Sequence, residues 1–599
     1  MFHGAQTIPT LFHTVAQTYT TRTALRVRKA GKLVDISWRL FYEQVVFCAL
    51  GLYALGVRAR DTVCIIAENR AEWLYTDLAV LTNRAVIVPL YTNCSDHDFR
   101  YIVSHCDAKY LVVSQEEFLE KFKRVHAMTP VHSLRTIIAF DDTAPVHGRA
   151  IVSFPSLIKD GKDLYMKNPG LFTELIAQGM PQDIATIIYT SGTTGDPKGV
   201  LLSHQNFIEN CRGCSRAITV TERDVSLSFL PLSHVFERLA GYYFFLFSGA
   251  TIAFAENMFA VIKNIREVQP TVMCAVPRFF ERVYHGIFDQ IEKKPFLART
   301  IFQWGLRIGR LYHTFKRRGR TVSAGVALVY YLYNTFIFKK LRKHVGGNIR
   351  FFISGGAALS KEIAYFFEII GITILEGYGL TETAPVVSVN TEERNKIGTV
   401  GFPLENLAVR IADDGEILVK GPSVMCGYFK DQRATGEVLR GDWLYTGDIG
   451  KIDSDGYLRI IDRKKDIIVL SGGKNVSPQR IETALIADKL FNQVVVYGDE
   501  QKHLVALIVP DRNQLELFAT NENIAYSCSD DLFDHPQVYA LFKKRINAIL
   551  ADFAAYEKIK NFKLLHTEFT LDNGELTPTF KIRRRVIYQR YKQILATLY

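Results

Sequence analysis

Glycines, hydroxyl side chains and a lysine are concentrated between residues 189 and 200, where the chain reads Tyr-Thr-Ser-Gly-Thr-Thr-Gly-Asp-Pro-Lys-Gly-Val. Glycines let the backbone approach a ligand closely, and backbone N–H groups and hydroxyls can bind phosphate oxygens. The lysine supplies a positive charge. The pattern therefore predicts a phosphate-binding loop, with candidate ligands Thr190, Ser191, Gly192, Thr193, Thr194, Gly195, Lys198 and Gly199.

The spacing of this loop differs from that of the P-loop nucleoside triphosphatases. Their loop requires Gly, four further residues, and then Gly-Lys-Ser or Gly-Lys-Thr. Counting from Gly192, position 197 is a proline, and Lys198 is followed by Gly199. The chain is therefore not expected to be a P-loop enzyme. On composition alone, a flexible surface loop of Ser, Thr and Gly is the alternative.

Further polar residues and glycine turns follow apolar runs in the second part of the chain. His234 ends the run Phe-Leu-Pro-Leu-Ser-His, and similar turns come after residues 350–354 and 373–376. Ligands bind beyond strand ends in open α/β sheets, so these turns indicate a shared crevice, although His234 alone could equally be a hydrogen-bonded core histidine. The turn residues are Gly356, Ala357, Gly377, Tyr378 and Gly379.

The elements that must position these residues alternate between strands and helices. Apolar runs predict strands over 61–67, 85–90, 109–113 and 184–188, and a helix is expected over 71–81. This alternation favours an α/β layer of parallel strands, followed by a second α/β block over 226–391. Residues 68–73 are interpreted as a capping loop.

From about residue 393 onward, the sequence pattern is one of short β segments separated by Asp-Gly turns. This pattern predicts a small β-rich subdomain. A charged link over 462–466 follows, and a compact α/β tail then runs to residue 599. We therefore expect an N-terminal domain over 1–462 and a C-terminal domain over 463–599. Lys581 in the tail lies far in sequence from the other candidate residues.

Composition limits the class of protein. A chain of 599 residues that is 48% hydrophobic can bury a large core, and its net charge of +12 favours anionic partners such as nucleotides, CoA, nucleic acid or an anionic membrane. Nine cysteines without framework spacing indicate a reducing compartment, and Cys211-Arg-Gly-Cys214 fits two structural cysteines better than a metal or redox site. The N-terminus lacks the pattern of a signal peptide, so a cytoplasmic or membrane-peripheral protein is expected.

Basic residues dominate one segment of the second block. Between residues 299 and 343 there are eleven Lys or Arg residues and no Asp or Glu, and residues 321–338 carry no charge. Eighteen residues only just reach the length of a membrane-spanning helix. The polar residues and tyrosines within the stretch favour either contact with a membrane surface or a buried helix.

Five motifs, in order, resemble those of the acyl- and aryl-adenylating (AMP-binding) superfamily. They begin at residues 189, 377, 445, 462 and 576 and read Tyr-Thr-Ser-Gly-Thr-Thr-Gly-x-Pro-Lys-Gly, Gly-Tyr-Gly-Leu-Thr-Glu, Tyr-Thr-Gly-Asp, Asp-Arg-x-Lys-Asp and Leu-Thr-Pro-x-x-Lys. Residues 68–73, 230–238 and 276–281 resemble motifs of the long-chain fatty-acid CoA ligases, and this resemblance extends over essentially the whole chain. Two departures are the turn Gly356-Ala-Ala-Leu359 and Phe236-Glu-Arg238, where some long-chain enzymes have a gating Trp.

The resemblance implies a large N-terminal domain of two α/β layers plus a β subdomain, with a small mobile C-terminal domain. It also implies a two-step reaction that uses ATP, Mg²⁺ and CoA. A fatty carboxylate attacks the α-phosphate of ATP to give acyl-AMP and pyrophosphate, and the CoA thiol then displaces AMP. The acyl chain is expected near His234, in a tunnel lined from residues 241–247.

The resemblance also implies roles for single residues. Charge neutralisation suits a reaction between two anions, and the loop from Thr190 to Gly199 would cover the triphosphate. Thr190 and Glu382 would bind Mg²⁺, Tyr378 would stack on the adenine, and Thr381 would contact the α-phosphate. Asp448 and Arg463 would bind the ribose, and Lys581 would bridge the carboxylate and the α-phosphate. The pantetheine channel would be formed at Gly472, Gly473 and Lys474.

Three other functions fit parts of the sequence. The first is an adenylating ligase that passes its acyl group to a carrier protein or acts on an aryl acid. The second is a catalytically silent, membrane-peripheral acyl-binding protein, and intact Lys581, Glu382 and Asp448 argue against it. The third is a nucleic-acid binder, which is disfavoured because the excess positive charge lies in one aromatic-rich segment.

Overall fold

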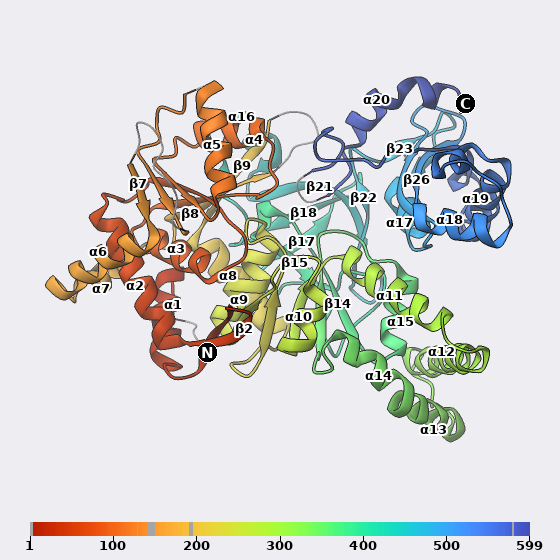
Figure 1. Cartoon of the computed structure of the whole chain (residues 1–599), viewed down its shortest axis with the longest axis horizontal. Coiled ribbons are helices and arrows are strands. Elements are labelled where there is room, and N and C mark those ends of the chain that lie inside the picture. Colours follow the sequence, from red (N-terminus) through yellow and green to blue (C-terminus); the bar gives the residue numbers. More distant parts are fainter. Residues whose placement is uncertain (1–3, 129, 142–149, 191–195, 578–579) are drawn as a thin grey trace.

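The computed structural model describes residues 4–128, 130–141, 150–190, 196–577 and 580–599. Figure 1 shows a large N-terminal part and a smaller C-terminal part at the upper right. The candidates Ser191, Gly192, Thr193, Thr194 and Gly195 lie outside the described residues.

An eight-stranded sheet organises the first α/β layer, in the order β19-β9-β8-β4-β3-β5-β6-β7. The neighbours from β4 to β7 are parallel, and β8 and β9 form an antiparallel pair. The predicted strands here are confirmed. The bounds are β3 Thr62–Ile66, β4 Val86–Leu90, β5 Tyr110–Val113, β6 Thr136–Ala139, β7 Ala150–Ser153, β8 Ile184–Thr190, β9 Lys198–Ser203 and β19 Gly427–Tyr428.

Both faces of this sheet are buried, as expected for parallel strands. Val63 and Ile65 of β3 belong to the main core, whereas Cys64 and Ile66 belong to a second core on the other face. The first face is covered by α1 (Ile8–Thr18), α2 (Trp38–Ala54) and α3 (Ala71–Thr82), and the second by α4 (Asp96–His105) and α5 (Glu116–Met128). Two more helices, α6 (Phe154–Lys167) and α7 (Leu171–Ala177), pack beside α2.

The second α/β block contains two sheets, of orders β10-β11-β1-β2 and β12-β13-β14-β15-β16. In the first, parallel pairing of β1 with β11 joins the N-terminal hairpin to this block. The strands are β1 Thr23–Lys29, β2 Lys32–Ser37, β10 Val225–Ser228, β11 Thr251–Phe254, β12 Val272–Ala275, β13 Phe351–Ser354, β14 Thr373–Gly379, β15 Val386–Val389 and β16 Phe402–Pro403. The helices include α8 His204–Ala217, the π-helix η1 Glu237–Tyr243, α9 Phe244–Ser248, α10 Val261–Val268, α11 Pro277–Glu292 and α15 Lys361–Ile369.

The basic, aromatic segment forms a helical projection, at the lower right of Figure 1. It contains α12 (Phe296–Arg317), α13 (Ala324–Tyr333), the π-helix η2 (Asn334–Phe338) and α14 (Lys339–Arg342). No residue of α13 is buried, so the interpretation of this stretch as a buried helix is wrong. Within the described residues, no helix is both long enough and apolar enough to cross a membrane.

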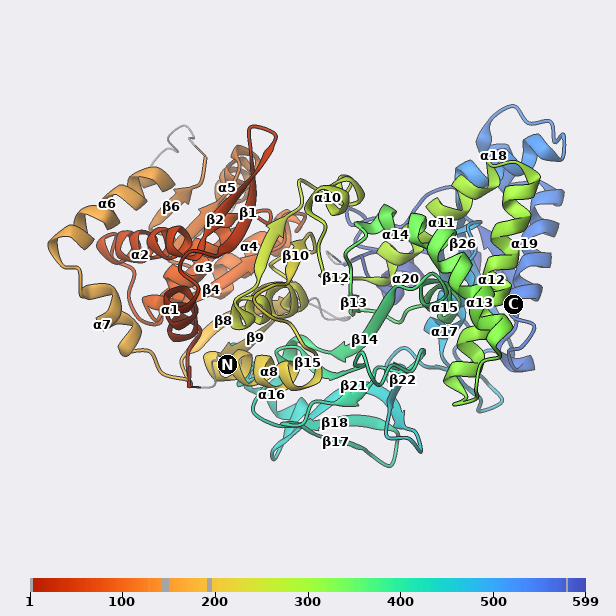
Figure 2. The same cartoon turned by 90° about the horizontal axis from the view of Figure 1, so that it is seen from below.

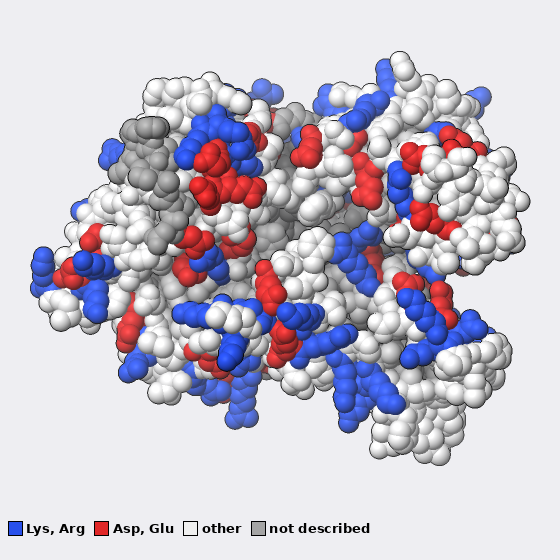
Figure 3. Space-filling view, viewed as in Figure 1, with Lys and Arg blue, Asp and Glu red and all other residues white. Residues whose placement is uncertain are grey.

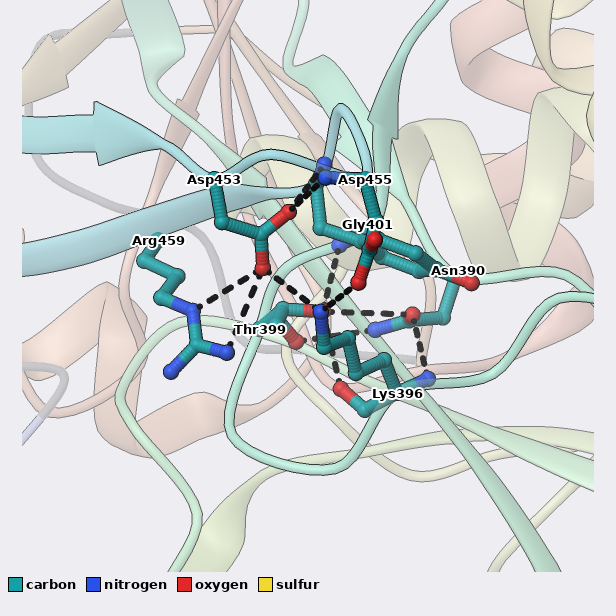
Figure 4. A network of polar contacts seen from close by, with 8 residues as sticks. Asn390, Lys396, Thr399, Gly401, Asp453, Asp455 and Arg459 are labelled. Carbon is teal, nitrogen blue, oxygen red and sulfur yellow. Dashed lines mark hydrogen bonds and ion pairs between the residues drawn. The ribbon is translucent and has the colours of Figure 1, made fainter. Parts of the chain in front are cut away.

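The β-rich subdomain follows, with the sheet β17-β18-β21-β20 and β22 paired to β21. Figure 4 shows how its β21–β22 hairpin is fixed to the loop before β16. Lys396 Nζ lies 2.8 Å from Asp453, which Arg459 also contacts, and Asp455 pairs with the same lysine. The hydrogen bond from Lys396 lowers the pKa of Asp453 to about 2. The strands are β17 Ala408–Ile411, β18 Glu416–Lys420, β20 Leu439–Arg440, β21 Trp443–Ile452 and β22 Leu458–Arg463, and α16 is Gln432–Val438.

The C-terminal part has its own three-stranded sheet, β25-β26-β27, with apolar cores on its two sides. It contacts the N-terminal part through α11, where Arg278 Nη2 donates to Asn492 Oδ1 at 2.8 Å and Lys489 Nζ lies 3.0 Å from Glu292. The large and small α/β parts confirm the predicted fold class. The elements are β23 Ile468–Val469, β24 Asn475–Val476, α17 Pro478–Ile486, β25 Phe491–Tyr497, β26 Leu504–Pro510, α18 Arg512–Asn521, α19 Pro536–Ile549, β27 Ile559–Leu564 and α20 Arg584–Ala596.

Candidate functional site

Asp448 is the anchor of a polar cluster at the junction of the second block and the β subdomain. Its Oδ2 accepts a hydrogen bond from the Tyr378 hydroxyl at 2.6 Å, and its Oδ1 lies 2.8 Å from Arg463 Nε. Strands β14, β21 and β22 supply the three residues, and Asp448 pairs with Arg463 in the β21–β22 register. Burial raises the pKa of Asp448, and the Arg463 charge acts in the opposite direction. A carboxylate has about four lone-pair positions, so both oxygens can accept further donors.

Glu382 lies in the short 3-10 helix η4 (Thr381–Thr383), directly after β14. The Tyr428 hydroxyl donates to its Oε1 at 2.9 Å, and Lys198 Nζ lies 5.0 Å from the centre of the same tyrosine ring. Lys198 is opposite Thr190 in the β8–β9 pair. Lys198 and Glu382 are therefore brought together through Tyr428, a residue that was not predicted to belong to the site.

Two glycines of the site are required by close backbone approach. A Cβ on Gly379 would lie 2.0 Å from the carbonyl oxygen of Pro385, and one on Gly377 would lie 3.2 Å from the carbonyl oxygen of Ser388. Both contacts come from the strand or turn that follows η4. A side chain at position 379 would collide with the Pro385 backbone, and one at position 377 would press against β15.

Lys581 enters this cluster from the C-terminal part. A tight turn presents it, in which Phe580 N donates to Thr577 O at 2.7 Å and Phe580 has a φ of 59°. The surrounding protein and the nearby Arg463 charge lower the pKa of Lys581, whereas Asp448 and Glu382 raise it. Its side chain remains exposed to solvent. Residues 382, 448, 463 and 581 therefore share one open, highly charged site.

His234 lies beside this charged site and is neutral. Burial and the positive charge of Lys581 lower its pKa to about 3. The loop that carries it is held by Asn69, whose Oδ1 accepts from Leu232 N at 3.1 Å and whose Nδ2 donates to Leu230 O at 2.6 Å. The interpretation of residues 68–73 as a capping loop is incomplete, because α3 has no side-chain cap and Asn69 instead braces the His234 loop.

The profile of the AMP-binding enzyme family matches residues 12–429, and that of the AMP-binding enzyme C-terminal domain matches residues 465–599. The chain belongs to the AMP-binding enzyme family. Among curated relatives, it is 33% identical to the long-chain-fatty-acid–CoA ligase FadD15 of Mycobacterium bovis, over 95% of this chain and 93% of the relative. It is 32% identical to the peroxisomal long chain acyl-CoA synthetase 7 of Arabidopsis thaliana, over 96% of this chain and 83% of the relative.

Solved structures of other AMP-binding enzymes share the fold. The anthranilate CoA ligase AuaEII, in complex with anthranoyl-AMP, superposes with a TM-score of 0.74 at 20% identity, covering 99% of this chain and 98% of its own. ATP-bound MatB from Rhodopseudomonas palustris gives a TM-score of 0.67 at 22% identity, covering 98% and 99%. At these identities the likeness concerns the fold alone.

Two groups of predicted site residues in this AMP-binding enzyme make no hydrogen bond or ion pair with the charged cluster among the described residues. Gly356, with a φ of 84°, and Ala357 form the turn after β13, whose neighbours in the sheet are β12 and β14. Gly472, Gly473 and Lys474 form the exposed β23–β24 turn, whose hydrogen bonds are made to Leu470 within the C-terminal part. Their predicted role in a pantetheine channel stays a prediction.

The nine cysteines are free thiols, seven of them buried and two exposed. Cys211 and Cys214 are both buried in α8. In the described part of the chain, no three His, Cys, Asp or Glu side chains are grouped so that they could hold a metal ion. The burial of both side chains agrees with the interpretation of the CxxC pair as structural.

Proposed function

We propose that this AMP-binding enzyme is a long-chain fatty acid CoA ligase, which converts ATP, a long-chain fatty acid and CoA into acyl-CoA, AMP and pyrophosphate. The observation that carries the proposal is the meeting of Lys581, Arg463, Asp448 and Glu382 in one open site. Family members related to this chain over almost its whole length are named as long-chain ligases, which supports the substrate class.

The first step brings two anions together, so positive charge is its main requirement. An oxygen of the fatty carboxylate attacks the α-phosphorus of ATP, and the bond to the pyrophosphate group breaks. Lys581 neutralises the carboxylate and the α-phosphate as they approach, while Lys198 and the loop over 190–199 hold the departing phosphates. His234 is neutral and can donate a hydrogen bond to a substrate oxygen without adding charge.

Asp448 and Arg463 position the nucleoside. The carboxylate of Asp448 keeps unused lone pairs for the two ribose hydroxyls, and the Tyr378 hydroxyl fixes its orientation. The Tyr378 ring would then stack on the adenine, and Thr381 would contact the α-phosphate. In the second step, the CoA thiolate attacks the acyl carbon and AMP leaves.

A Mg²⁺ ion fits the donors of the site as a partner of the phosphates. Glu382 and Thr190 offer hard oxygen ligands, which Mg²⁺ prefers. Tyr428 donates to Glu382 Oε1 and so fixes the orientation of the carboxylate that would hold the ion. When bound, Mg²⁺ neutralises phosphate charge and orients the pyrophosphate as it leaves.

We also propose that the projection over α12–α14 docks on an anionic membrane surface, with the protein peripheral on the inner face. Large apolar side chains are exposed along α12, α13 and η2, among them Phe296 at 75%, Trp304 at 54%, Leu328 at 61%, Tyr331 at 63% and Phe336 at 64%. Figure 3 shows this white projection with Lys and Arg gathered at its base and no acidic side chain on the visible tip. Apolar side chains flanked by positive charge suit an anionic lipid surface.

Pyrophosphate release over a panel of C6 to C20 fatty acids, with and without CoA, tests the activity. Each additional buried CH₂ contributes roughly 0.8 kcal/mol, so kcat/KM is expected to rise into the long-chain range. Acyl-CoA should form only when CoA is present. A steady fall beyond C8 would contradict the long-chain assignment. Adenylation without transfer to CoA would instead favour a ligase that serves a carrier protein.

A further inference from the structure

Asn69 lies in the loop between β3 and α3 of the first α/β layer. Helix α3 begins without a side-chain cap, so the amide of Asn69 does not serve its own helix. Its hydrogen bonds are made instead to the second α/β block, 159 to 163 residues further along the chain. They reach the turn that runs from Ser228, the last residue of β10, toward His234. The amide therefore joins the two layers at the turn that carries His234.

Both ends of the Asn69 amide are used in this turn. Nδ2 donates to the Leu230 carbonyl oxygen at 2.6 Å and to Ser228 Oγ at 2.9 Å, and Oδ1 accepts from Leu232 N at 3.1 Å. Only Asn and Gln combine an NH₂ group with a carbonyl oxygen, and Gln is one methylene longer. An aspartate could not make the two donated bonds. The three hydrogen bonds therefore specify an asparagine at position 69.

Ser228 extends this restraint to the far side of the turn. Its Oγ accepts from Asn69 and uses its single proton to donate to Glu237 Oε1 at 2.5 Å. Glu237 begins the π-helix η1 and is buried, and burial raises its pKa to about 8, so that it is a neutral acid at pH 7. The turn is thus fixed on both sides of His234, directly by Asn69 before it and through Ser228 after it.

The ring of His234 is oriented by the same turn. Phe236 N donates to His234 Nδ1 at 3.2 Å, and His234 N donates to the Pro231 carbonyl oxygen at 2.9 Å. Because Nδ1 accepts, the proton of the neutral ring lies on Nε2, and Nε2–H is the donor that the ring can offer to a ligand. A shift of the turn would therefore move this donor.

A separate ion pair holds η1 against the first layer. Arg238 Nη2 lies 2.5 Å from Asp77 Oδ1 of α3, and the Tyr243 hydroxyl donates to Asp77 Oδ2 at 2.8 Å. Arg238 and Asp77 are both fully buried. Loss of the Asn69 amide would therefore leave the two layers joined, and its effect is expected to be confined to the turn.

Resting on the proposed function, we propose that Asn69 is a positioning residue for adenylation, which holds the turn over 228–237 so that His234 Nε2–H donates to the fatty acid carboxylate. Asn69 acts through His234 and does not touch the substrate. Without the amide the donor would be misplaced, and catalysis is sensitive to small displacements of positioned groups. The use of the fatty acid should suffer, whereas the binding of ATP should not.

A double-mutant cycle tests whether Asn69 acts through His234. Asn69→Ala should lower kcat/KM for the fatty acid in pyrophosphate release roughly tenfold or more, with KM for ATP unchanged. In a His234→Ala background, the same substitution should lower it by less than about twofold, because the donor is already absent. An equal loss in the two backgrounds would overturn the proposal, as would an unchanged value for Asn69→Ala.

Two further variants separate this effect from a loss of stability. Asn69→Asp keeps an acceptor but no donor, and it should be impaired at least as much as Asn69→Ala. Asn83→Ala removes another buried amide of the first layer, whose Nδ2 donates to the carbonyl oxygens of Ala49 and Ala79, both at 2.9 Å. It should lower the unfolding temperature and leave kcat/KM for the fatty acid unchanged.

The outcomes distinguish the two proposals. If Asn83→Ala lowered kcat/KM as much as Asn69→Ala, the loss would reflect stability alone and the positioning role would be wrong. Failure of the wild type to release pyrophosphate with any fatty acid would instead contradict the proposed function.

Discussion

The charged residues of the site keep one another in place before any substrate binds. Asp448 is held by Tyr378 on one side and by Arg463 on the other, and Glu382 is held by Tyr428. Side chains that are fixed in advance do not have to reorganise when the substrates bind. In the proposed reaction, Asp448 would therefore accept from the ribose hydroxyls, and Glu382 would bind the Mg²⁺ that accompanies the phosphates, without large side-chain motion.

The neutral state of Glu237 predicts an unusual pH dependence of stability. Its pKa rises from 4.5 to about 8 on folding, so the stabilisation is complete below pH 4.5 and is lost as the pH rises toward 8. Glu237→Gln is neutral at every pH and lacks this dependence. The unfolding free energy of the wild type relative to Glu237→Gln should fall by on the order of a few kcal/mol between pH 5 and pH 8. Denaturation curves that keep a constant separation across this range would refute it.

The site residues that belong to motifs could be predicted from the sequence, because the motifs resemble those of the AMP-binding superfamily. Asp448, Arg463, Glu382 and Lys581 are examples, and the structure brings all four together. Tyr428 and Asn69 could not be found in this way. Tyr428 lies in a strand of only two residues, and the function of Asn69 depends on a loop that is far away in sequence.

At the scale of elements, the projection of α12 and α13 was the feature that periodicity could not resolve. An uncharged stretch of eighteen residues is compatible with either a buried or an exposed helix. The outcome depends on packing. Gly305 of α12 leaves room for Tyr333 of α13, and Gly309 leaves room for Ile369 of α15. Helix α12 therefore packs between α13 and α15, and the other side of α13 is left exposed. Strands within the sheets were easier to predict, since their apolar runs are short and bounded by turns.

Membrane docking should depend on the free basic residues of this projection. Lys316, Arg318 and Arg320 are exposed, whereas Arg317 pairs with Glu368 and should be left in place. Replacing the three with Ser should weaken binding to anionic vesicles by about 1 kcal/mol per residue in a salt-sensitive way, measured by sedimentation.

A matched control removes three positive charges from the opposite end of the molecule. Lys159, Lys162 and Lys167 of α6 are exposed, and Figures 1 and 2 show that α6 lies far from α12 and α13. Their replacement with Ser should leave vesicle binding unchanged. Equal sedimentation of the wild type and both variants would mean that this surface does not bind lipid.

At the scale of the whole molecule, the C-terminal part carries the residues that are predicted to serve the two half-reactions, in two separate loops. Lys581 lies in the site, whereas the turn at Gly472, Gly473 and Lys474 is exposed elsewhere. The contacts of Arg278 with Asn492 and of Glu292 with Lys489 are polar and exposed to solvent. Such an interface can open, and we propose that the domain over 463–599 rotates about residues 462–466 between the two steps.

The most direct test measures adenylation and thioester formation separately in the variants Lys581→Ala and Lys465→Pro. Lys581→Ala removes the charge that joins two anions, so adenylation should fall by at least about 10²-fold, while thioester formation from supplied acyl-AMP survives. Lys465→Pro restricts the backbone at the expected hinge, so pyrophosphate release should continue for about one turnover while acyl-CoA production stalls. Equal loss of both half-reactions in both variants would contradict a ligase that uses one rotating domain for two steps.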